Sequence, residues 1–181
     1  MASDANSSAL SDIAWRATRK PARGGVPNLL CLAEPLAVLS AELGPIADRV
    51  SVILPWGSLL RALATPEIDS LRQIARLCLP DATLEIVFSY DSQRDAHVGR
   101  AFLPATLAQQ HIAANMPGLY EQAGLRIIAA DEIPQRQLAE YQTTWAKRLA
   151  FGRSRRVWRI QARYRASETS AASGKRNDSN P

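Results

Sequence analysis

The chain has 181 residues, of which 46% are hydrophobic and 22% are charged, and its formal net charge at pH 7 is +5. This length and composition are typical of one globular domain that buries a substantial core. The sequence has neither an apolar run of about 18 residues nor a signal peptide, so we expect no membrane span and no secretion, and we expect the protein in the cytoplasm.

Cysteine and histidine do not indicate a metal centre. Cys31 and Cys78 each lie in an apolar setting, where we expect reduced core thiols rather than a disulfide or metal ligands. His97 and His111 have no partners at ligand spacing, so we interpret both as surface or loop histidines. The sequence therefore predicts a protein without a metal ion.

Strands and helices alternate along most of the chain. Short apolar runs bounded by Pro, Gly or Asp predict strands, and apolar residues three and four apart predict helices. In chain order, we expect a helix over 9–19, strands over 28–33 and 50–54, helices capped by Ser58 and by Thr65-Pro66-Glu67, a turn at Pro80-Asp81, a strand over 83–90, a helix over 117–123, a strand over 125–130, a helix over 135–150 and a strand over 155–164.

This order predicts an α/β fold with one domain over 1–166. The alternation up to residue 92 favours a parallel sheet, and the closing strands favour an antiparallel edge. Residues 91–115 are polar and loosely patterned, which indicates an irregular or helical insertion. Residues 167–181 are Ser, Ala, Asn and charged residues without an apolar anchor, so we expect a disordered tail.

Two segments are basic and contain no acidic residue. Residues 141–166 include eight Lys or Arg side chains, and residues 13–27 include four. A run of like charge is commonly a solvated face. Two such segments in one domain are equally typical of a surface that binds phosphates.

One apolar run ends in a tryptophan. Residues 50–54 lead into Pro55-Trp56-Gly57, and helical spacing restarts at Leu59. A continuous apolar run is typical of a strand buried on both faces, so we expect Trp56 just past the carboxyl end of a central strand, where open α/β sheets bind ligands. Core packing is the alternative for this tryptophan, and it is our expectation for Trp15 and Trp158.

Three motifs carry a resemblance to a known family. They are Lys20-Pro21-Ala22-Arg23-Gly24-Gly25, Pro55-Trp56-Gly57-Ser58-Leu59-Leu60 and Trp145-Ala146-Lys147-Arg148-Leu149-Ala150-Phe151-Gly152-Arg153. Together, over about residues 4–164, the chain resembles the aminoglycoside-resistance methyltransferases of 16S ribosomal RNA. The resemblance implies a Rossmann-like fold and a monomer that methylates N1 of the decoding-site adenine in the 30S subunit, with S-adenosylmethionine as the donor.

The resemblance also implies roles for particular residues. Trp56 and Trp145 would hold the flipped adenine between their rings, and the carbonyl of Leu54 or Pro55 would accept a hydrogen bond from its amine. The alternative for Trp145 is the apolar face of the helix over 135–150.

Further residues would contact the cofactor and the RNA. The set implied for S-adenosylmethionine is Asp4, on the ribose hydroxyls, Glu34 or Ala37, at the adenine, and Ile53 and Ser58, of which Ser58 is equally explained as a helix cap. The set implied for RNA is Arg16, Arg19, Lys20, Arg23, Arg100, Lys147, Arg148, Arg153 and Arg155.

The chain departs from the family at one motif. A Gly-rich turn after the first strand normally lets the backbone approach the methionine part of the cofactor, and no D-x-G-x-G-x-G occurs in this sequence. We therefore expect the first strand and most of the second strand of the family sheet to be missing, through an upstream true start or a truncated gene. A truncated remnant that binds RNA without catalysis is the alternative function.

Overall fold

The computed structural model describes residues 1–26, 28–89, 116–141 and 143–166. In chain order the elements are β1 (Ala2–Ser3), α1 (Ser7–Ala17), η1 (Pro21–Arg23), β2 (Cys31–Leu32), α2 (Leu36–Glu42), β3 (Ala47–Ile53), α3 (Gly57–Ala64), α4 (Ile68–Leu77), β4 (Cys78–Ser89), α6 (Met116–Gln122), β5 (Leu125–Ile133), η3 (Gln135–Glu140), α7 (Thr144–Ala150) and β6 (Val157–Tyr164). The expected insertion over 91–115 and the expected tail over 167–181 lie outside the described residues.

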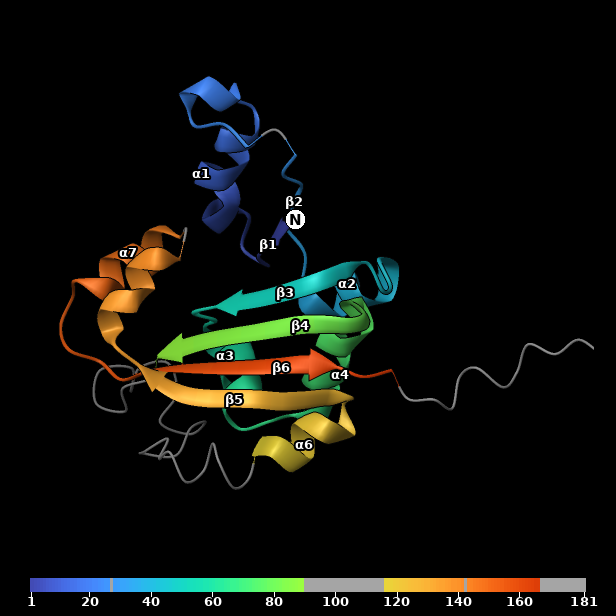
Figure 1. Cartoon of the computed structure of the whole chain (residues 1–181). Coiled ribbons are helices and arrows are strands. Elements are labelled where there is room, and N and C mark those ends of the chain that lie inside the picture. The colour runs from blue at the N-terminus through green and yellow to red at the C-terminus, as the bar shows by residue number, and fades with distance from the viewer. Residues whose placement is uncertain (27, 90–115, 142, 167–181) are drawn as a thin grey trace, which may run out of the picture.

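A four-stranded mixed sheet forms the centre of the fold. Its order is β3-β4-β6-β5, with β3 parallel to β4 and with β6 antiparallel to both β4 and β5. The predicted α/β class, with a parallel part and an antiparallel edge, is therefore confirmed (Figure 1). No helix in the described ranges is long and apolar enough to cross a membrane.

A second, two-stranded sheet joins β1 to β2. The pair is parallel, with Ala2 opposite Cys31 and Ser3 opposite Leu32. The strand expected over 28–33 is thus only two residues long. Figure 1 shows this pair beside the β3 edge of the larger sheet.

β3 lies at the edge of the four-stranded sheet rather than at its centre. Within the part of the chain that the structure describes, β3 pairs with β4 only. Val50 and Val52 are half-buried and Ser51 is exposed. The expectation of a strand buried on both faces is therefore wrong, because burial on both faces requires neighbours that the described elements do not provide.

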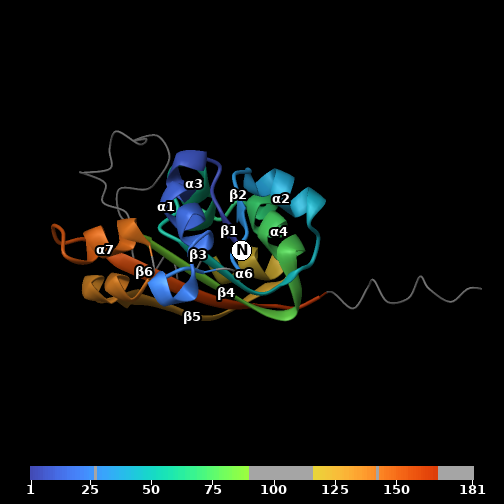
Figure 2. The same ribbon diagram turned by 90° about the horizontal axis from the view of Figure 1, so that it is seen from above.

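The main core lies between one face of the sheet and helices α3, α4 and α6. Leu84, Ile86 and Phe88 alternate along β4 and point into this core, as the two-residue period of a strand requires. Figure 2 shows these helices stacked over the same face. Trp158 of β6 is only 2% exposed here, so the packing predicted for it is confirmed.

A smaller apolar cluster underlies η3 and α7. It joins Val87, Ile133 and Val157 of the sheet to Ala146 and Ala150 of α7. The single helix expected over 135–150 is wrong, because the chain leaves the helical conformation at Tyr141, with φ −77° and ψ 131°, before α7 begins. Thr143 then caps α7 by accepting a hydrogen bond from the Ala146 N–H at 3.0 Å.

Three other local predictions need correction. Ser58 does not cap its helix, since α3 begins at Gly57 and its N-cap residue is Trp56. The hydroxyl of Thr65 donates to the Arg61 carbonyl at the end of α3 rather than capping α4. The predicted turn at Pro80-Asp81 lies inside β4, where the pairing with β3 is irregular.

Candidate functional site

Trp56 lies on a tight turn at the end of β3. Leu54 has a φ of +50° and Gly57 a φ of +60°, and the Leu54 N–H still donates to the Val87 carbonyl at 2.7 Å. A left-handed conformation at a residue other than glycine costs about 1–3 kcal/mol and recurs where function requires a particular geometry. The turn leaves Trp56 46% exposed, which argues against core packing as its role.

Trp145 lies in the first turn of α7 and points away from the core. Its neighbour Ala146 is fully buried, whereas Trp145 is 45% exposed. The Arg148 guanidinium lies 5.9 Å from the centre of the indole ring. The alternative that placed Trp145 on the apolar face of one long helix is therefore wrong, because that helix is divided and the ring is exposed.

The two tryptophans emerge from one packed region. Leu54, two residues before Trp56, and Ala146, directly after Trp145, belong to the same apolar cluster. Figure 1 shows α7 at the end of the sheet toward which the arrows of β3 and β4 point. The structure thus brings both segments to the carboxyl end of these strands.

Tyr141 ties the start of the α7 segment to the sheet. Its hydroxyl donates to Glu85 Oε1 at 3.1 Å, and Glu85 also lies 3.8 Å from the Arg49 guanidinium. Burial and the neighbouring Glu85 carboxylate raise the pKa of the Tyr141 hydroxyl. This anchor on β4 and the Thr143 cap together fix where α7, and hence Trp145, begins.

The residues predicted to bind the cofactor follow β1, β2 and β3. Asp4 and Glu34 come soon after the paired residues Ser3 and Leu32, and both are exposed. The Ser3 hydroxyl donates to the Glu34 carbonyl at 3.4 Å, and Asp4 Oδ1 accepts from the Asn6 N–H at 2.8 Å. The two carboxylate residues therefore lie at the same end of one strand pair.

The other three cofactor candidates lie near the same strands. Ala37 is exposed in the first turn of α2, and Ile53 is half-buried at the last position of β3. Ser58 is exposed in the first turn of α3.

The N-terminal basic segment is organised around two glycines. Gly24 has a φ of +75° at the end of η1, and a Cβ on Gly25 would lie 1.9 Å from the Arg19 carbonyl oxygen. Trp15 is 60% exposed with the Arg19 guanidinium 4.5 Å above its ring, so the packing expected for it is wrong. The basic residues that this turn presents are Arg16, Arg19, Lys20 and Arg23.

The C-terminal basic segment extends from α7 into the connection to β6. Lys147, Arg148 and Arg153 are exposed and Arg155 is half-buried. Arg156 instead donates to Glu132 at 3.0 and 2.7 Å. This pairing lowers the pKa of the Glu132 carboxyl. Arg100, also predicted to bind RNA, lies outside the described residues.

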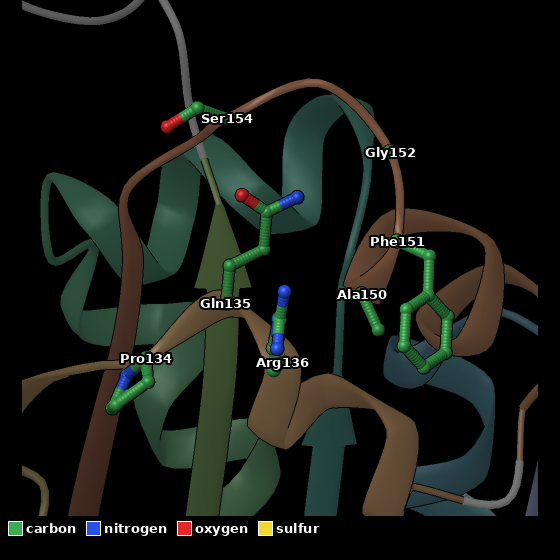
Figure 3. A pocket seen from close by; sticks show the side chains of 7 residues that line it. All are labelled: Pro134, Gln135, Arg136, Ala150, Phe151, Gly152 and Ser154. Carbon is green, nitrogen blue, oxygen red and sulfur yellow. The ribbon is translucent and has the colours of Figure 1, made fainter.

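The structure reveals a feature of this segment that the sequence did not suggest. Gln135 donates to the carbonyls of Leu149 and Arg153 and accepts from the Arg155 N–H. A hollow lies beside it, with exposed Phe151 on one wall (Figure 3). Bonds to main-chain atoms leave no residue pattern, so no sequence signal could have found them.

The two cysteines are free thiols in different surroundings. Cys78 is buried and Cys31 half-buried, and both are free. Burial raises the pKa of the Cys78 thiol to about 11. In the described part of the chain, no three His, Cys, Asp or Glu side chains are grouped closely enough to hold a metal ion.

Comparison with known proteins gives consistent matches. The family model described as NpmA, 16S rRNA (adenine(1408)-N(1))-methyltransferase, matches residues 1–164. A 16S rRNA (adenine(1408)-N(1))-methyltransferase of Escherichia coli is 32% identical over 152 residues, which are 83% of this chain and 69% of that protein.

Solved structures agree with the sequence matches. The aminoglycoside resistance methyltransferase NpmB1 is 36% identical with a TM-score of 0.70, over 90% of this chain and 73% of that one. A mutant 16S rRNA (adenine(1408)-N(1))-methyltransferase from Catenulisporales acidiphilia, with cosubstrate SAM, is 28% identical with a TM-score of 0.73, over 88% and 71% of the two chains.

Proposed function

Because the chain belongs to the 16S rRNA (adenine(1408)-N(1))-methyltransferase family, we propose that Trp56 and Trp145 hold the target adenine during its methylation at N1. The reaction is methylation of this base in 16S rRNA with S-adenosylmethionine as the donor, and members of the family confer aminoglycoside resistance. We further propose that the protein acts as a monomer on the 30S subunit in the cytoplasm, without a metal ion.

The chemistry requires positioning more than proton transfer. Adenine N1 is a neutral ring nitrogen with a free lone pair, so it attacks without a strong general base. S-adenosylmethionine supplies an electrophilic methyl group on a sulfonium. Holding reacting atoms in attack geometry contributes about 7–11 kcal/mol in well-oriented systems, so the residues that fix the adenine plane carry most of the catalysis.

The two tryptophans fit that task. A base inside a helix must be flipped out at a cost of about a few kcal/mol, and stacking on an aromatic side chain returns about 1–3 kcal/mol per base. Trp56 and Trp145 are each nearly half exposed and emerge from one apolar cluster. This is the observation that carries the proposal. The carbonyl of Leu54 or Pro55, on the same turn, then orients N1 by accepting from the exocyclic amine.

Residues after β1, β2 and β3 fit the nucleoside part of the donor. The exposed Asp4 carboxylate suits the ribose because one carboxylate accepts two hydroxyl protons. Glu34 or Ala37 would meet the adenine, and Ile53 and Ser58 would line the remaining wall. Glu34 is favoured over Ala37 as the polar contact because its backbone is bonded to Ser3, beside Asp4.

The two basic segments would bind the phosphates of ribosomal RNA. Arg16, Arg19, Lys20 and Arg23 would contact phosphates on one side, and Lys147, Arg148, Arg153 and Arg155 on the other, with Arg100 added from the insertion. Phosphate contacts set register and the shape of the RNA selects the site. Arg156 is not in this set because Glu132 already pairs with it.

A primer-extension assay tests the function. Purified protein, 30S subunits and S-adenosylmethionine labelled in the methyl group are mixed, and the extracted 16S rRNA is reverse transcribed. Methylation at N1 blocks Watson–Crick pairing, so we expect incorporated label and a stop at the decoding-site adenine. Binding to 30S subunits without label or stop would refute catalysis and favour the RNA-binding alternative.

A further inference from the structure

Gln135 holds the connection between α7 and β6 in one conformation. Its Nε2 donates to the Leu149 carbonyl at 2.5 Å and to the Arg153 carbonyl at 3.1 Å, and its Oε1 accepts from the Arg155 N–H at 2.8 Å. One side chain thus joins the end of α7 to both sides of Ser154. A surface connection is ordinarily mobile, and these bonds give this one a fixed shape.

An open surface hollow of about 380 Å³ lies between the fixed connection and η3. Figure 3 shows the connection arching over Gln135, with Arg136 and Phe151 among the side chains that line the hollow. This volume is at the lower end of the range for ligand sites, about 300–1,000 Å³. It therefore suits a unit the size of one nucleotide.

The walls combine an exposed aromatic ring with positive charge. Phe151 is 75% exposed, more than any other large hydrophobic side chain among the described residues. Arg136 is exposed on η3 and lines the hollow, whereas Arg153 is exposed on the connection, between the lining residues Gly152 and Ser154. The negative charge of the nearby Glu132 carboxylate is balanced by its ion pair with Arg156. An aromatic face beside arginines is the combination that binds single-stranded nucleotides by stacking and phosphate contact.

We propose that this hollow is a nucleotide-binding subsite for 16S rRNA, separate from the tryptophan pair. Phe151 stacks on an unpaired base, Arg136 contacts the adjoining phosphate, and Gln135 is the positioning residue that keeps the subsite and Arg153 in place. The inference rests on the proposed function for the identity of the RNA. It extends that function by giving Phe151 of the third motif a role and by adding Gln135 and Arg136, which lie outside the three motifs.

The test measures affinity for 30S subunits by filter binding without S-adenosylmethionine, so that it is independent of catalysis. We expect Phe151→Ala to weaken binding at least about fivefold, as loss of one stacked base does, and Arg136→Gln to weaken binding and flatten its salt dependence. Ile128→Ala and Arg126→Gln are matched controls, because these side chains are exposed on β5. Wild-type affinity for both hollow variants, or equal losses in the controls, overturns the subsite.

Gln135 is tested through its coupling to Arg153. Gln135→Met keeps the length of the side chain but removes all three hydrogen bonds, so we expect weaker 30S binding in the wild-type background. We expect little further loss once Arg153→Ala is present, since the residue acts through that arginine and its neighbours. Additive losses, or a loss explained by a lower free energy of unfolding in urea, overturn the positioning role. All of these experiments measure binding to 30S subunits and not methylation. A wild-type protein that binds but does not methylate would therefore refute the proposed function without contradicting the nucleotide-binding subsite.

Discussion

Replacing Trp145 with alanine separates catalysis from folding. The indole is 45% exposed, and the Arg148 guanidinium lies 5.9 Å from the centre of its ring, so truncation opens a gap at the surface rather than a core cavity. If the ring stacks on the target base, its loss removes about 1–3 kcal/mol of transition-state positioning, which is about a 5- to 150-fold loss in kcat/KM. We expect the same for Trp56→Ala, whose ring is 46% exposed.

The assay is methyl transfer to 30S subunits, run beside filter binding and urea unfolding. The two remaining tryptophans serve as controls. Trp15→Ala removes a ring that is 60% exposed and lies under Arg19, apart from the tryptophan pair, so we expect any loss of rate to follow a loss of 30S affinity. Trp158→Ala removes a ring that is 2% exposed, and we expect a fall of about 3–5 kcal/mol in the free energy of unfolding, as for other large core truncations.

The expected pattern is therefore lower methylation by the Trp56 and Trp145 variants, with unchanged stability and nearly unchanged 30S affinity. The reasoning is refuted if both variants methylate at the wild-type rate. It is refuted equally if their loss of rate follows a loss of stability of the size seen for Trp158→Ala, since the rings would then be structural.

Three further predictions concern docking, backbone packing and pH. Arg153→Glu should weaken 30S binding first and lower the slope of affinity against salt; equal affinity in filter binding would contradict the RNA contact. Gly25→Ala should lower the Tm, because the new Cβ would lie 1.9 Å from a carbonyl oxygen, whereas Gly118→Ala, with nothing within 4 Å, should not; a Tm unchanged in both would disprove the close approach. Burial raises the pKa of the Cys78 thiol from 9.0 to about 11, so the unfolded state loses this proton at a lower pH than the folded state. The free energy of unfolding should therefore fall as the pH rises from about 9 to about 11. Urea titrations at a series of pH values should show a smaller fall for Cys78→Ala than for the wild type.

The parts of the site that the sequence predicted are those set by neighbouring residues. An apolar run followed by Pro55-Trp56-Gly57 ends a strand wherever the strand packs, so the place of Trp56 followed from local signals. The position of β3 at the edge of the sheet did not follow from local signals. An apolar run indicates how much a strand is able to bury, but it does not indicate which strands pair with it.

The division of the expected helix over 135–150 depends on a distant contact. Leu138, Tyr141, Trp145 and Leu149 recur three and four residues apart, and no Gly or Pro interrupts them, so local pattern favours one helix. The hydroxyl of Tyr141 bonds instead to Glu85, 56 residues earlier in the chain. A tertiary hydrogen bond of this kind overrides helix propensity, which is weak at each residue.

The two tryptophans are fixed by different means, and the difference bears on how the site works. Leu54, two residues before Trp56, is held at a φ of +50°. The backbone direction at Trp56 is therefore set by a strained turn, which the hydrogen bond from the Leu54 N–H to the Val87 carbonyl maintains. The position of Trp145 is set by two hydrogen bonds of residues that precede α7. The Tyr141 hydroxyl donates to Glu85, and the Thr143 hydroxyl caps the helix. A displacement of about 1 Å in a reacting group can lower a rate about 100-fold. If the two rings define the plane of the target base, as proposed, both backbones must be held independently. The left-handed turn at Leu54 and the break in the helix before α7 hold them in this way.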